Sequence, residues 1–149
     1  MLTEEAKRRI IQYRGLALGL FQSVSFSASC SEYDIRNGFS RLYYSFFHAS
    51  LALLLSRHVN IETFRKNHGV VHTEIDKLLG KYVGRFFREL YLARIQSDYE
   101  PDVFAAKYHG QLDRARFDAN SLLTRASAYF YWVQQESRKV LVGAKISYD

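Results

Sequence analysis

The segment from Leu42 to Leu55 constrains the fold of this chain most, because it is apolar over almost its whole length. Ser45, His48 and Ser50 interrupt it, and it is too short and too polar to span a membrane. A helix that is apolar over most of its girth is normally packed on several sides by neighbours. We therefore expect a buried central helix surrounded by other helices.

Local signals set the limits of this helix. Ser31 and Asp34 have the spacing of an N-terminal capping pair, so the helix is predicted to begin there and to run to about Arg57. Its apolar residues form one main stripe and a second stripe about 100° away. The main stripe is Ile35, Phe39, Leu42, Phe46, Ala49 and Leu53, and the second is Tyr43, Phe47 and Leu54.

Further segments have the periodicity of amphipathic helices, and none alternates with the period of a strand. The predicted helices span residues 3–30, 67–79, 84–98 and 112–137, with a connection at 58–66. Gly80 is expected to end the helix before it, and Pro101 to close the one at 84–98. The prediction is an all-α fold, an antiparallel bundle of four to five helices that forms a single domain over residues 1–149.

The single cysteine and the net positive charge indicate the compartment and the kind of partner to expect. A single cysteine, Cys30, excludes an internal disulfide framework, and the N-terminus does not resemble a signal peptide, so a reducing cytoplasm is expected. The net charge is +6 and comes mostly from arginine, which favours phosphate-bearing partners. A solvated basic surface is an equally good explanation of this charge.

Two ionisable residues share one side of the central helix. Arg41 and His48 are seven positions apart, so their directions differ by only about 20°. Tyr44 and Ser45 are each three or four positions from both of them, and Asn37 lies one turn before Arg41. Charged groups on an otherwise apolar helix need partners or water, so a cleft or an interface is predicted here.

The pair suits RNA cleavage without a metal. A guanidinium can hold a phosphate with two hydrogen bonds, and an imidazole can take or give a proton near pH 7. One histidine does not readily fill both proton roles, so a two-fold homodimer with two such pairs is expected. A purely structural role also fits, in which Arg41 pairs with a carboxylate such as Asp98 and His48 bonds a backbone carbonyl.

Three segments of the chain resemble the HEPN family over about residues 31–135. They are Ser40-Arg41-x-Tyr43-Tyr44-x-x-Phe47-His48-Ala49, which resembles the signature helix of small stand-alone HEPN proteins, the basic segment Lys66-Asn-His68-Gly69-Val70, and Arg94-x-x-x-Asp98-Tyr99. The resemblance implies an all-α dimer whose cleft bears the arginine and histidine of both subunits. Many such proteins cleave RNA without metal as toxins or defence effectors. Others bind a nucleotide or partner a minimal nucleotidyltransferase antitoxin without catalysis.

These observations favour a homodimeric, metal-independent endoribonuclease in which His48 is the acid and base and Arg41 binds the scissile phosphate. The residues expected to orient them or to bind RNA are Asn37, Tyr44, Ser45, Lys66, His68 and Asp98. The alternative is a non-catalytic HEPN module that binds a nucleotide or a nucleotidyltransferase partner through the same cleft. No cofactor, metal or membrane is predicted for either function.

Other residues have simpler explanations. His68 and His72 have the spacing of a helical metal site but lack further ligands, so solvated surface histidines are expected. Arg94 and Asp98 are predicted to form an ion pair that positions their helix, and the alternative is that Asp98 orients Arg41 or His48. The aromatic run at 129–132 is expected to serve the core or a dimer contact.

Overall fold

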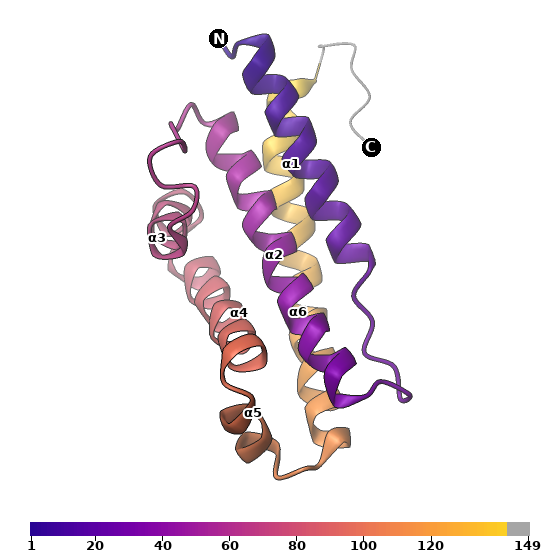
Figure 1. Cartoon of the computed structure of the whole chain (residues 1–149). Helices are drawn as coiled ribbons and strands as arrows, with labels where there is room; N and C mark the ends of the chain where they lie inside the picture. The colour runs from indigo at the N-terminus through magenta and orange to yellow at the C-terminus, as the bar shows by residue number, and fades with distance from the viewer. Residues whose placement is uncertain (143–149) are drawn as a thin grey trace.

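The structure is a computed structural model that describes residues 1–142, and within them the protein is all-α, as predicted. Figure 1 shows the helices in chain order. They are α1 (Glu4–Gln22), α2 (Glu32–Ser56), α3 (His68–Leu79), α4 (Lys81–Tyr99), α5 (Pro101–Tyr108) and α6 (Leu112–Arg138), and the short 3-10 helix η1 (Lys139–Leu141) follows. None of these described helices is both long and apolar enough to cross a bilayer.

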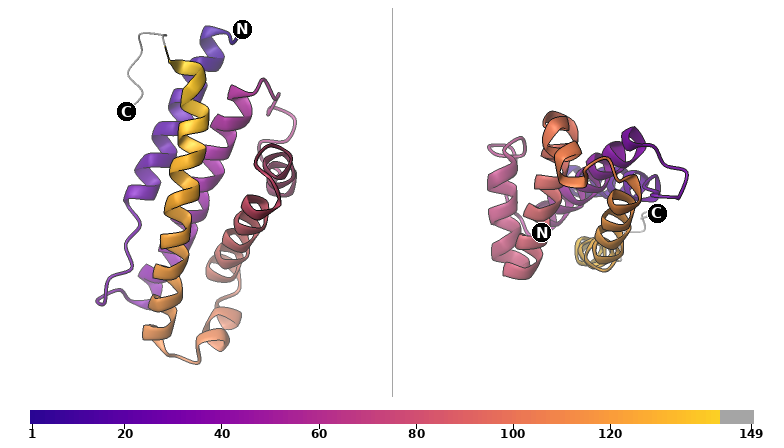
Figure 2. Two further views of the ribbon diagram at one scale, coloured as in Figure 1. Left: turned by 180° about the vertical axis from the view of Figure 1, so that it is seen from behind. Right: turned by 90° about the horizontal axis from the view of Figure 1, so that it is seen from below.

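The long helices form the antiparallel bundle that the sequence predicts. Along the bundle, α1 descends, α2 ascends, α4 descends and α6 ascends, while α3 lies across this direction (Figure 1). Seen from behind, α6 covers the side of α2 that faces away from the viewer in Figure 1 (Figure 2). The central place of α2 is confirmed, because α1, α3, α4 and α6 all pack against it.

Capping and burial of α2 follow its sequence pattern. The Ser31 hydroxyl accepts the Asp34 backbone N–H at 3.1 Å, and the Asp34 carboxylate accepts the Ser31 N–H at 3.0 Å, which completes the predicted capping box. All nine residues of the two apolar stripes are buried in the core. The sequence therefore predicts both where this helix begins and which sides it buries.

The first helix is shorter than predicted. It ends at Gln22 and not near Cys30, and residues 23–31 form a loop that nevertheless inserts Val24, Phe26 and Cys30 into the core. Serine hydroxyls in this stretch bond locally, Ser23 to the Leu20 carbonyl at 2.7 Å and Ser27 to Ser29 at 3.0 Å. Such side-chain bonds compete with the helical pattern, which explains the early end.

The segment around Pro101 holds a helix that the sequence analysis does not predict. Pro101 occupies the first turn of α5, where its missing N–H costs nothing, so it begins a helix as well as following the end of α4. Upstream, α3 ends at Leu79 as predicted and begins one residue later than predicted, with Asn67 as its N-cap, and only Gly80, at φ 93°, separates it from α4. The start of α4 at Lys81 is therefore three residues earlier than predicted.

Candidate functional site

One side of α2 carries the polar residues singled out in the sequence, and no helix lies in front of α2 in the view of Figure 1. We refer to Asn37, Arg41, Tyr44 and His48 as the Arg41–His48 face. Helix α1 borders it through Tyr13, whose ring stacks on that of His48 with centroids 6.0 Å apart. Helix α4 borders it through contacts to Tyr44, so the face lies between these two helices.

Arg41 is exposed, and within residues 1–142 its guanidinium has no hydrogen bond or ion pair. Its charge acts on the carboxylate of Asp34, whose pKa is lowered mainly by the hydrogen bonds from Ser31 and further by Arg41. Arg41 and Asn37 line a hollow of about 300 Å³ together with serines of the loop that follows α1. Asp98 is not the partner of Arg41, so this guanidinium is available to an anion from outside the chain.

The His48 ring is half-buried and presents its two nitrogens differently. Nδ1 is buried and has no hydrogen-bond partner among the described residues, so the backbone-carbonyl bond considered for it is not formed. Nε2 also lacks a partner but is not enclosed, so it is the nitrogen that water or a substrate can reach. Burial lowers the pKa of His48 below its ordinary value. The ring is therefore neutral at pH 7 and can accept a proton.

The predicted supporting residues fall into two groups. The Tyr44 ring stacks on the His48 ring, with centroids 6.2 Å apart. The Tyr44 hydroxyl accepts a hydrogen bond from Arg94 Nη2 at 2.7 Å, which fixes the tyrosine beside the histidine. Ser45 is instead completely buried, and its hydroxyl donates to the Leu42 carbonyl at 2.6 Å. The structure therefore brings Tyr44 and Asn37 to Arg41 and His48 but does not bring Ser45 to them.

Arg94 organises the side of the face that borders α4. Its buried guanidinium donates to Asp98 at 3.0 Å, which confirms the predicted ion pair, and to the Tyr99 hydroxyl at 3.0 Å. Asp98 also accepts the Ser40 hydroxyl of α2 at 3.1 Å. Asp98 thus contacts neither Arg41 nor His48 and acts on the face only through Ser40 and Arg94.

The two histidines of α3 are linked to α2 through Tyr43. The Tyr43 hydroxyl lies 2.6 Å from His68 Nδ1 and 2.9 Å from His72 Nε2. His72 is buried, so the expectation of a solvated surface histidine is wrong for it, and burial, with a smaller effect of His68, lowers its pKa to about 4. The spacing of these histidines beside the buried Val71 and Ile75 is the one sequence signal that could have indicated this burial.

Lys66 and His68 lie next to the Arg41–His48 face. Both line an open hollow of about 680 Å³ formed by residues 62–69 and Tyr91. The Tyr44 ring centre is 6.2 Å from that of His48 and 6.3 Å from that of His68, so one tyrosine contacts both histidines. Among residues 1–142 no group of three or more histidine, cysteine or acidic side chains has the geometry of a metal site.

Comparisons with known proteins return no relative: no protein-family model, no curated protein and no solved structure matches this chain. The resemblance of its three segments to the HEPN family therefore remains an expectation from the sequence. Any conclusion about function depends on the geometry of Arg41, His48 and their surroundings.

Proposed function

We propose that this protein is a metal-independent endoribonuclease of the HEPN kind, which acts as a homodimer with Arg41 and His48 in the dimer cleft. One observation carries the proposal. A guanidinium without a hydrogen bond or ion pair among residues 1–142 and a neutral imidazole whose Nε2 is not enclosed lie on the same side of α2. Phosphate binding and proton transfer, the two functions that RNA cleavage needs, are thus on one surface.

In the proposed reaction, His48 Nε2 takes the proton of a ribose 2′-hydroxyl, and the resulting oxygen attacks the adjacent phosphorus. Arg41 donates two hydrogen bonds to the non-bridging oxygens, whose charge rises in the phosphorane. The bond to the 5′-oxygen then breaks, and this oxygen leaves with a proton. The products are a 2′,3′-cyclic phosphate and a free 5′-hydroxyl, and no cofactor is consumed.

The proton needed by the leaving oxygen is the reason to propose a dimer. A His48 that has just accepted a proton cannot donate at the same moment, and the other histidines near the face are tied to Tyr43. A second copy related by two-fold symmetry brings a second His48 to the same phosphate. This second imidazole acts in its protonated form and gives its proton to the 5′-oxygen, while the first His48 takes the proton of the 2′-hydroxyl. The Arg41–His48 face, which lies between α1 and α4, is the surface through which the two copies would meet.

The experiment is to incubate purified protein with total RNA in EDTA and to analyse the fragment ends. We expect cleavage that leaves 2′,3′-cyclic phosphates, and a loss of roughly 10²-fold or more in rate for Arg41→Ala, which removes the phosphate ligand. Arg85→Ala is the matched control, because Arg85 is also exposed and lies on α4 away from this face. Cleavage that is equally fast in both variants would refute the proposal.

A binding function at the same surface is the second candidate. The rings of Tyr13, His48 and Tyr44 lie against one another beside Arg41, an arrangement that can hold a base by stacking and a phosphate by its charge. In that case the chain is a non-catalytic HEPN module for a nucleotide or a nucleotidyltransferase antitoxin in the cytoplasm. Calorimetry with AMP separates the two candidates: tight binding that Arg41→Ala abolishes, without RNA turnover, favours the module.

A further inference from the structure

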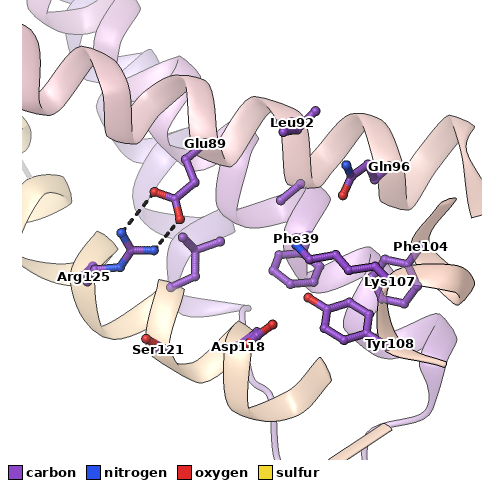
Figure 3. A pocket seen from close by; sticks show the side chains of 12 residues that line it. Phe39, Glu89, Leu92, Gln96, Phe104, Lys107, Tyr108, Asp118, Ser121 and Arg125 are labelled. Carbon is purple, nitrogen blue, oxygen red and sulfur yellow. Dashed lines mark hydrogen bonds and ion pairs between the residues drawn. The ribbon is translucent and has the colours of Figure 1, made fainter. Parts of the chain in front are cut away.

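A further hollow lies on the opposite side of α2 from the Arg41–His48 face. It is formed by α4, α5 and α6, with Phe39 of α2 at its base, and has a volume of about 290 Å³ (Figure 3). Phe39 precedes Arg41 by two positions, so the two side chains leave α2 about 160° apart. The hollow is therefore separate from the proposed nuclease site.

Part of its lining is aromatic. Phe39, Phe104 and Tyr108 are each at most 5 % exposed and line the hollow together with Leu122. The Phe39 and Phe104 rings meet edge to face at 6.2 Å, and Phe104 and Tyr108 do so at 5.0 Å. Surfaces of this kind bind planar ring systems, because a flat ligand contacts several ring faces and edges at once.

Most charged groups at the rim are already paired. Arg125 donates to both carboxylate oxygens of Glu89, at 2.6 and 3.1 Å (Figure 3). Asp118 faces the Tyr108 hydroxyl, and burial together with this carboxylate raises the pKa of Tyr108 to about 12. Three of the four ionic side chains of the hollow therefore have internal partners.

Lys107 is the fourth, and within residues 1–142 its ammonium makes no ion pair. It lies over the Tyr108 ring, 5.4 Å from the centroid, and its side chain extends across the hollow toward Phe39. The amide of Gln96 points toward it from α4 (Figure 3). A cation held over an aromatic ring beside an amide can bind a carboxylate without first breaking an ion pair.

We infer that this hollow binds a small, planar aromatic ligand with one negative charge. The ring system would lie among Phe39, Phe104 and Tyr108, and the carboxylate would pair with Lys107 and accept a hydrogen bond from Gln96. The volume agrees with the lower end of small-molecule sites, so the ligand has one or two rings. This site is independent of the proposed RNA cleavage.

The test is a titration of the protein, followed by amide NMR shifts, with three probes that share a naphthalene ring and carry a negative, a neutral and a positive substituent. The probes are 2-naphthoate, 2-naphthylmethanol and 2-naphthylmethylammonium. We expect shifts around α5 and the middle of α6, with affinity falling in that order. If naphthoate causes no shifts there, or if the ammonium probe binds as tightly as naphthoate, the inference is wrong.

Variants locate the site. Lys107→Met should weaken the binding of naphthoate about tenfold and leave the affinity for the naphthyl alcohol unchanged. The change removes the ammonium that pairs with the carboxylate but keeps an apolar side chain of similar length. Lys81→Met is the matched control, since Lys81 is an exposed lysine at the distant start of α4. Ala93→Phe should fill the hollow and abolish binding of both probes. An unchanged naphthoate affinity in Lys107→Met would overturn the inference, even if Ala93→Phe failed to fold.

Discussion

Tyr43 has one phenolic proton but lies within hydrogen-bond distance of two imidazoles. It can donate to only one of them, so the other histidine must donate an N–H to the phenol oxygen, which restricts the tautomers of His68 and His72. Burial strongly raises the pKa of Tyr43, so the hydroxyl stays protonated at all ordinary pH values. This cluster joins α2 to α3 behind the Arg41–His48 face.

Replacing Tyr43 by phenylalanine should therefore destabilise the protein. The change leaves His72 Nε2 buried without its hydrogen bond, which costs about 1–3 kcal/mol. Urea denaturation measures this loss, and Tyr33→Phe is the control because Tyr33 is 70 % exposed. Equal unfolding free energies for the two variants would show that the tyrosine–histidine bonds contribute nothing to stability.

His72 should also make stability depend on pH. Its pKa is about 4 in the folded protein and 6.5 when solvated, so between these values the unfolded chain binds more protons. The free energy of unfolding is then highest above about pH 6.5 and falls as the pH approaches 4, by on the order of 3 kcal/mol for this residue. His48 and His68 act in the same direction, because burial lowers both their pKa values.

Urea denaturation at several pH values between 7.5 and 4.5 measures this dependence. His72→Gln keeps a hydrogen-bonding side chain that does not titrate, so its unfolding free energy should change less over this interval. If the variant and the wild type lose stability equally, the titrating group lies elsewhere.

Among the elements, α2 could be predicted from the sequence because its information is local. The capping pair at Ser31 and Asp34 and the two apolar stripes are readable without knowing any other helix. Helix α6 could be predicted for the same reason, because its apolar residues recur at helical spacing over many turns. The sequence does not predict helix α5, because its eight residues give too few turns for a periodic pattern. In addition, a proline such as Pro101 is common both after the end of one helix and at the start of another.

Two glycines give opposite predictions for the helices that contain them. A Cβ at Gly15 of α1 would meet nothing, so Gly15→Ala should stabilise the protein by up to about 1 kcal/mol through helix propensity. A Cβ at Gly84 of α4 would overlap the Asp76 carboxylate of α3, which Arg88 holds at 3.1 Å. Gly84→Ala should therefore displace the Asp76 carboxylate and disturb its pair with Arg88, at a cost of roughly 1–3 kcal/mol.

Thermal melting of the two alanine variants measures both effects. We expect a higher melting temperature for Gly15→Ala and a lower one for Gly84→Ala. A tolerated Gly84→Ala would mean that α3 and α4 do not pack as closely as described. A destabilising Gly15→Ala would indicate that the outer surface of α1 is covered in solution.

In the bundle as a whole, helix α2 lies between the two candidate sites. The Arg41–His48 face lies on one side of α2, and the aromatic hollow lies on the other, where α4, α5 and α6 line it. The shared face of Arg41 and His48 follows from helical spacing, so the sequence predicts it. The burial of His72 and the bond from Arg94 to Tyr44 depend on contacts between helices, so no local pattern could predict them.

In the proposed reaction, His48 transfers a proton during RNA cleavage. The most direct test is the single-turnover cleavage rate of a defined RNA in EDTA for wild type, His48→Ala and His58→Asn. His58 is the control because it is exposed, and asparagine tolerates its φ of 62°. We expect the cleavage rate to fall about 10²- to 10⁴-fold for His48→Ala and to stay unchanged for His58→Asn. A His48→Ala protein that stays folded and cleaves RNA at the wild-type rate would show that His48 does not transfer the proton.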